Sequence, residues 1–157
     1  MDTASTLIGL GLLAVFVLPI LFLIWQQNNK EKNRLKNLKK LSNQNNLTTD
    51  IVELSATLLL GLDSKAKKLL VIEPTNNMKH QVLDLSYIKN TTVSSHPFPD
   101  NAQLIKRISL DLSENRNNKK LTEIIFYDED DNANNNASER LIVAQKWNRI
   151  ISEKLSA

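Results

Sequence analysis

Residues 6–25 read TLIGLGLLAVFVLPILFLIW, and this segment decides the architecture of the chain because it contains no charged side chain. At about 1.5 Å per helical residue it reaches about 30 Å, the thickness of the hydrocarbon core of a bilayer. Pro19 is compatible with this, since transmembrane helices tolerate proline. We therefore predict a transmembrane helix over residues 6–25, preceded by a short extracytoplasmic N-terminus of residues 1–5.

Three other interpretations fit the segment less well. A cleaved signal peptide has a basic start and small residues at its cleavage site, whereas this chain begins with MDTAST and its apolar segment ends in Ile24 and Trp25. A cysteine-linked lipid anchor is excluded because the chain has no cysteine. A buried core helix would need more apolar residues around it than the rest of the chain supplies.

A juxtamembrane basic cluster follows the apolar segment and contains a single acid, Glu31. Its six cations are Lys30, Lys32, Arg34, Lys36, Lys39 and Lys40. Basic residues near the end of a transmembrane helix stay on the cytoplasmic side, so we predict that the N-terminus lies outside and the rest of the chain in the cytoplasm. The same cations can bind anionic headgroups, at about 1 kcal/mol per residue, so a topology signal and a lipid contact are both open.

The positive charge of the chain belongs to this border and not to the C-terminal part. The six cations and Glu31 give residues 26–41 a charge of +5, Asp2 removes one, and the whole chain carries +3, which leaves −1 for residues 42–157. A nucleic-acid-binding domain would be basic. The predicted partners are therefore the lipid bilayer, anionic headgroups and a protein, and not a nucleic acid.

No motif for catalysis or cofactor binding can be found. His80 and His96 lack the spacing of a helical metal pair, and Gly61 is the only glycine outside the apolar segment, which excludes phosphate-binding glycine loops. The acids in or beside predicted strands form no recognisable pair: Asp84, Asp111 and Glu123. We expect neither an enzyme nor a cofactor, and a membrane-tethered enzyme is kept as the least favoured alternative.

Residues 26–46 are interpreted as a basic linker, in which Leu35, Leu38 and Leu41 favour a short helical continuation of the anchor. A domain of residues 47–157 follows. Leu47, Ile51 and Leu54 have helical spacing, which predicts a helical turn before the first strand. Short apolar runs separated by turn residues then predict an antiparallel sheet. The predicted strands are residues 56–62 and 68–73 as a hairpin, 80–93 as one bent strand or two, 104–112 and 120–127.

Two further elements are predicted in this domain. Residues 94–102, SSHPFPDNA, contain two prolines and are expected to break the sheet, with Phe98 between them as a lid. A helix is expected over residues 139–155, with Ser138 as its N-cap and Trp147 in the middle of an apolar stripe as a core anchor. Such a helix would cover the apolar face of the sheet.

Three segments together resemble the pleckstrin-homology-like (PH-like) fold: LLLGLDSKAKKLLVIE (58–73), QVLDLSYIKNTTV (81–93) and ERLIVAQKWNRIISEKL (139–155). The resemblance covers residues 56–157 and implies an α+β domain, an antiparallel half-barrel or sandwich of six or seven short strands capped by a C-terminal helix. The whole layout is similar to small single-pass bacterial proteins, which implies the inner (cytoplasmic) membrane. Domains of this family recognise lipid headgroups or peptides, so the resemblance implies a non-catalytic binding or scaffolding module.

In lipid-binding members of the family, a basic cluster between the first two strands holds phosphates. The resemblance places Lys65, Lys67 and Lys68 in that loop, but Asp63 adjoins them and no arginine is present. A solvated turn is favoured there.

Residues 128–139 have the spacing of a calcium loop. Positions 1, 3, 5, 7, 9 and 12 would be Asp128, Asp130, Asn132, Asn134, Asn136 and Glu139. Ala133 stands where such a loop needs glycine, and the preceding segment is a predicted strand and not a helix. A polar connection is favoured, and no metal is predicted.

The favoured hypothesis is a single-pass membrane protein whose cytoplasmic PH-like domain binds a partner near the membrane. The alternative is a subunit that assembles through its transmembrane helix, where Ser5 and Gly9 form a small-xxx-small pair.

Overall fold

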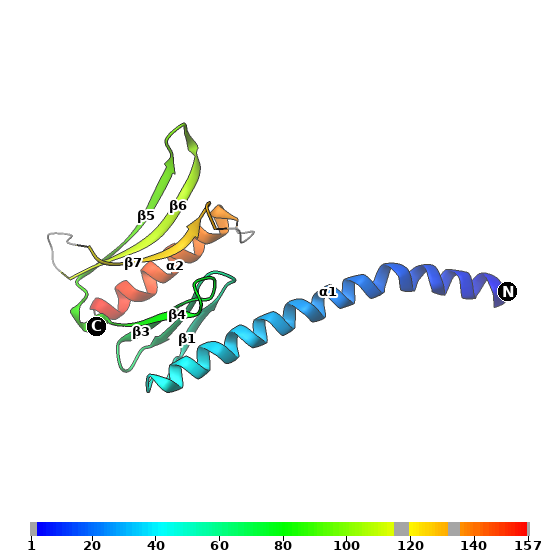
Figure 1. Ribbon diagram of the computed structural model, residues 1–157, viewed down its shortest axis with the longest axis horizontal. Coiled ribbons are helices and arrows are strands. Elements are labelled where there is room, and N and C mark those ends of the chain that lie inside the picture. The colour runs from blue at the N-terminus through cyan, green and yellow to red at the C-terminus, as the bar shows by residue number, and fades with distance from the viewer. Residues whose placement is uncertain (1–2, 115–119, 132–135, 157) are drawn as a thin grey trace. The chain divides into compact units, whose positions relative to one another are not determined.

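The computed structural model describes residues 3–114, 120–131 and 136–156. The chain divides into two compact units, with the boundary between Asn37 and Leu38. Figure 1 shows the order of the helices and strands along the chain. The elements are α1 (Thr3–Gln44), β1 (Ile51–Leu54), β2 (Leu59–Asp63), β3 (Lys68–Glu73), β4 (Lys79–Asp84), the 3-10 helix η1 (Leu85–Tyr87), β5 (Asn90–Phe98), β6 (Asn101–Ser113), β7 (Lys120–Asp128) and α2 (Ala137–Ser156).

The first unit is helical throughout its described residues. By length and composition, α1 qualifies as a membrane-crossing helix over Gly11–Gln44, with a mean hydropathy of 1.7 in its most apolar window and none of that window buried. The expected apolar helix is therefore present. The helix does not stop at Trp25 but continues through the predicted linker as far as Gln44.

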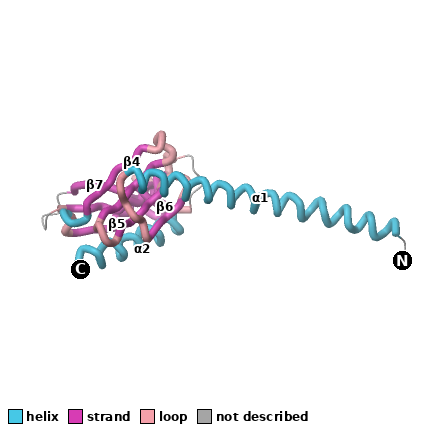
Figure 2. Tube along the Cα trace, turned by 90° about the horizontal axis from the view of Figure 1, so that it is seen from below, coloured by secondary structure: helices cyan, strands magenta, loops and turns pink. Residues whose placement is uncertain are grey.

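The second unit is α+β, as expected, with two antiparallel sheets and one C-terminal helix. The four-stranded sheet has the order β1-β2-β3-β4 and the three-stranded sheet the order β5-β6-β7. Figure 2 shows the strands in magenta with α2 beside them. Trp147, Ala144 and Ile151 of α2 are fully buried among apolar side chains of both sheets, so the helix and the two inner sheet faces share one core.

The four-stranded sheet is covered on both faces. Its inner face contributes residues such as Leu60 and Val71 to the core with α2. On its outer face, Leu59, Leu70 and Ile72 form a second cluster with Leu38 of α1 and with Leu47. Because both faces are buried, the sequences of β2 and β3 are nearly continuous apolar runs. A sheet with one solvent-exposed face would instead show alternating apolar and polar residues.

Gly61 is required where the outer face of β2 meets the chain that follows α1. A Cβ atom added to Gly61 would lie 2.7 Å from Cγ2 of Thr49 and 3.3 Å from Cδ2 of Leu38. Both neighbours are side chains that seal this face, so the close approach fixes residue 61 as glycine.

Three local predictions are corrected by the structure. Ile51–Leu54 form strand β1, paired with β2, and not a helical turn. Residues 94–102 do not break the sheet, because β5 continues to Phe98 and β6 begins at Asn101, with a register shift at Pro97. Phe98 is therefore part of a strand. An edge strand tolerates proline, and β5 is the edge of its sheet.

For two further segments, the structure gives element boundaries that the sequence did not predict. Residues 80–93 become two strands, β4 and β5, separated by η1. The C-terminal helix begins at Ala137, and Asn136 Oδ1 accepts a hydrogen bond from the N–H of Ser138 across 3.0 Å. Asn136, and not Ser138, is thus the capping side chain.

Candidate functional site: an acidic groove

A cavity of about 400 Å³ lies within the second unit, between the β1–β2 loop, the end of β3 and the edge of β7. We call it the acidic groove. Its lining residues are Thr57, Leu58, Val71, Glu73, Thr75, Asn76, residues 124–128, Asp130 and Asp131.

The groove has an apolar floor and an acidic rim. Leu58, Val71, Ile124 and Phe126 are buried and belong to the shared core. The carboxylates of the lining are Glu73, Asp128, Asp130 and Asp131, and among the residues that the structure describes no lysine, arginine or histidine lines the groove. The floor offers apolar contact and the rim a negative potential, so the groove suits a ligand that is apolar and cationic.

One wall of the groove is the edge of a strand. Five consecutive residues of β7, 124–128, line it. The register of β7 against β6 shifts between Ile125 and Tyr127, which marks a β-bulge at Phe126, so this run does not follow the strict alternation of a regular strand. The lining includes residues of both faces of β7, which places the edge of the strand at the groove. Within the described part of the chain, β7 pairs with β6 alone, which leaves its other edge unpaired.

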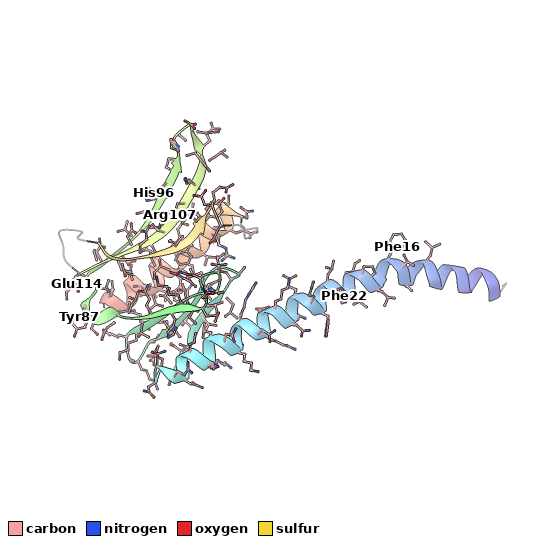
Figure 3. The ribbon with its side chains drawn as sticks, in the orientation of Figure 1. Phe16, Phe22, Tyr87, His96, Arg107 and Glu114 are labelled. Atoms are coloured by element: carbon pink, nitrogen blue, oxygen red, sulfur yellow. The ribbon has the colours of Figure 1, made fainter. Side chains whose placement is uncertain are left out.

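Two of the rim acids are held in place from β6. Arg107 Nε lies 3.9 Å from Asp128 Oδ2, and Lys106 Nζ lies 3.5 Å from Asp130 Oδ2. Arg107 also pairs with Glu123 at 3.4 Å. Figure 3 shows Arg107 on the hairpin that β6 forms with β5, below His96. These pairs are partly exposed, so they position the carboxylates more than they stabilise the fold.

Glu73 and Tyr127 have partners of their own. The amide Nδ2 of Asn76 donates a hydrogen bond to Glu73 Oε2 at 3.0 Å. The phenol of Tyr127 donates one to Glu129, which raises the pKa of Tyr127 above its ordinary value. Tyr127 thus stays protonated and serves as a hydrogen-bonded wall residue.

The predicted calcium loop overlaps the groove at Asp128 and Asp130. Asn132 and Asn134 lie outside the described residues. Asp128 accepts a hydrogen bond from the N–H of Asp130 at 3.2 Å, Asn136 caps α2, and Glu139 lies in the first turn of α2. In the described segments of the chain, no group of three or more histidine, cysteine, aspartate or glutamate residues is arranged to hold a metal ion.

The lysines at positions 65, 67 and 68 are not between the first two strands. Lys65 and Lys67 follow β2 and Lys68 begins β3, so this basic loop joins the second and third strands of the structure. Asp63 accepts hydrogen bonds from the N–H groups of Lys65, Ala66 and Thr48 at 3.1, 2.9 and 2.7 Å, and these bonds, that of Ala66 first, lower its pKa below 3.8. Those amides are therefore not available to a phosphate.

The loop that does lie between the first two strands has the opposite character. Residues 55–58 read SATL, contain no basic side chain, and contribute Thr57 and Leu58 to the acidic groove. A phosphate headgroup at this position would face carboxylates and no cation.

The other residues singled out in the sequence are dispersed. The juxtamembrane basic cluster lies along α1, with five exposed cations and a partly buried Arg34. His80 lies on β4 and His96 on β5, in different sheets. Asp84 caps η1, Asp111 accepts hydrogen bonds from Ser94 and Ser109, and Glu123 pairs with Arg107. Ser5 and Gly9 lie in α1.

Sequence reasoning did not find the groove, because it is built from three segments that are far apart in the chain. The available signal was the acidic run at residues 128–131 directly after the last predicted strand. No protein-family model, no curated protein and no solved structure matches the chain.

Proposed function

We propose that this chain is a single-pass protein of the inner (cytoplasmic) membrane whose cytoplasmic, PH-like domain is a non-catalytic binding or scaffolding module. The observation that carries the proposal is α1. This one helix contains both an apolar segment of membrane-crossing length and, in residues 38–44, the cover of the outer face of the four-stranded sheet. A domain built onto the end of its own anchor is suited to act beside a bilayer.

The PH-like assignment is supported by the strand arrangement. Sheets of four and three antiparallel strands, followed by a C-terminal helix with a buried central tryptophan, correspond to the layout that the resemblance implies. The binding role is supported by the acidic groove, which combines an apolar floor, a charged rim and an unpaired strand edge.

Anionic headgroups are assigned to the juxtamembrane basic cluster and not to the domain. The groove would repel them, and the amides of the loop at residues 64–67 are occupied by Asp63. The groove is left for a protein partner.

The proposal is tested by the topology of the full chain in bacterial membranes. A C-terminal fluorescent-protein fusion should fluoresce, and a C-terminal alkaline phosphatase fusion should be inactive, because phosphatase needs the extracytoplasmic side. Replacing the six cations of the juxtamembrane basic cluster by glutamine should reduce this bias. The matched control replaces Lys65, Lys67 and Lys68 by glutamine, which also removes positive charge but should leave the orientation unchanged. An active phosphatase fusion on the unaltered chain would show that the C-terminus is extracytoplasmic. That result would refute both the proposed orientation and a cytoplasmic partner.

A further inference from the structure

We infer that the acidic groove binds an extended segment of a partner protein, in which lysine or arginine alternates with apolar residues, and that this segment pairs as an added strand with the free edge of β7. The inference rests on the proposed binding function and names the chemistry of the partner.

The strand edge carries the first step. Residues 124–128 line the groove, and the described strands give β7 no partner on its side away from β6. An unpaired edge offers N–H and C=O groups at regular spacing, which an extended peptide can meet with a ladder of hydrogen bonds. β7 contains no proline, and its one lysine, Lys120, precedes the residues that line the groove. The bulge at Phe126 twists the edge locally, so pairing is expected on either side of it.

The dimensions of the groove set the length of the segment. At about 3.4 Å per residue, the five lining residues of β7 border at most about 17 Å of the groove, and because one of them is bulged, about four residues of a partner can pair there. Alternate side chains of the added strand would point to opposite faces. One set would contact the floor at Leu58, Val71 and Phe126, which favours apolar residues at those positions.

The acidic rim favours cationic side chains at the other alternate positions of the added strand. Within the described lining, Glu73, Asp128, Asp130 and Asp131 have no cation beside them, and Asp128 and Asp130 are paired with Arg107 and Lys106 of β6. An added strand with lysine or arginine at alternate positions would place cations among these carboxylates. A second copy of this chain is a poor occupant, because pairing two β7 edges would bring two acidic rims together.

The experiment uses the full chain in nanodiscs of zwitterionic phosphatidylcholine, so that cationic peptides are not attracted to the lipid. Three heptapeptides are compared: alternating lysine and valine, the same with glutamate in place of lysine, and the same with proline in place of valine. The lysine–valine peptide should slow amide hydrogen exchange at residues 124–128. The glutamate peptide should not bind because of its charge. The proline peptide should bind much more weakly, because proline removes the N–H donor at every second position and its fixed φ favours a polyproline conformation that cannot follow the strand edge.

Charge variants locate the binding. Asp131→Lys and Glu73→Lys should each weaken binding of the lysine–valine peptide at least about tenfold, with a smaller effect at high salt. Asp100→Lys, an exposed acid in the turn between β5 and β6, is the matched control and should bind as the unaltered chain does. Because Asp131 is exposed, its replacement tests the groove even where Glu73→Lys disturbs the turn that Asn76 stabilises.

Two results would overturn the inference. Equal binding of the lysine–proline peptide would show attraction by charge without strand pairing. Protection of residues 124–128 without peptide, rising with protein concentration, would identify a second copy as the occupant. Neither result changes the orientation reported by the C-terminal fusions, so failure here is distinguishable from failure of the proposed function.

Discussion

The indole Nε1 of Trp147 donates a hydrogen bond to Oε2 of Glu53 across 3.4 Å, which joins α2 to β1 over 94 positions of sequence. Lys146 Nζ lies 3.8 Å from the same carboxylate oxygen. The edge strand of the four-stranded sheet is thereby tied to the C-terminal helix by a polar contact at the border of a core that is otherwise apolar.

Trp147→Ala should lower the free energy of unfolding of the domain by about 3–5 kcal/mol, because it removes the largest fully buried side chain and leaves a cavity. Urea unfolding of the full chain in nanodiscs, followed by circular dichroism, measures the loss. The control is Trp25→Phe, since Trp25 is the other tryptophan of the chain and is 64% exposed in α1. Equal losses in the two variants would contradict a core role for Trp147.

Gly61→Ala should destabilise the domain by about 1–3 kcal/mol, because the new Cβ would lie 2.7 Å from Cγ2 of Thr49. Thr49→Ser removes that methyl group, so the double variant should recover part of the loss. Unfolding of both single variants and the double variant, followed by Trp147 fluorescence in a Trp25→Phe background, gives the coupling between the two positions. Additive losses would show that the contact with Thr49 is not the cause.

Leu38→Ala should cost the domain about 2–5 kcal/mol, because Leu38 is fully buried against Leu59, Leu70 and Ile72. The same substitution at Leu18, which is on the same helix but 63% exposed, should leave the unfolding of the domain unchanged. The same fluorescence assay measures both. If Leu38→Ala had no effect, the end of α1 would not be part of the folded domain.

The stability of the domain should depend on pH through Asp63. Hydrogen bonds from Ala66, Thr48 and Lys65 hold the pKa of this carboxyl below 3.8 in the folded chain. A depressed folded-state pKa means that the carboxylate stabilises the fold above the unfolded-state pKa, and that this contribution is lost as the pH falls through the folded-state pKa. Unfolding midpoints measured from neutral pH downwards should show this loss below about pH 4.

Asp63→Asn is the matching variant. It should be less stable at neutral pH, because an amide has one acceptor oxygen where the carboxylate has two, and the part of the acid-induced loss that belongs to residue 63 should be absent. A variant whose acid profile runs parallel to that of the unaltered chain would assign the acid sensitivity to other carboxylates.

Local patterns predicted the parts of the fold that are decided locally. The apolar run of α1, the hairpin of β2 and β3 and the stripe of α2 around Trp147 each follow from spacing and composition. β1 was missed because Leu47, Ile51 and Leu54 have helical spacing, and only the pairing with β2 makes residues 51–54 a strand. The prolines at 97 and 99 suggested a break, because the sequence does not say that β5 is an edge.

The groove could not be read from the sequence for a related reason. Thr57, Glu73 and Asp131 come together only through the pairing order of two sheets, and each residue by itself is an ordinary polar turn or strand-end residue. The acidic run after β7 was interpreted as a connection or a calcium loop, whereas the structure ties Asp128 and Asp130 to the cations of β6.

The burial of Leu59, Leu70 and Ile72 beneath residues 38–44 also determines where the protein can be cut in two. A protease that severs α1 ahead of Leu38 would release a body that keeps this sheet face covered by its own helical stub. A cut beyond Gln44 would remove Leu38 and Leu41 from this cluster and expose part of the same three side chains, which favours aggregation of the released product. A soluble product therefore requires that the cut fall within α1, on the N-terminal side of Leu38.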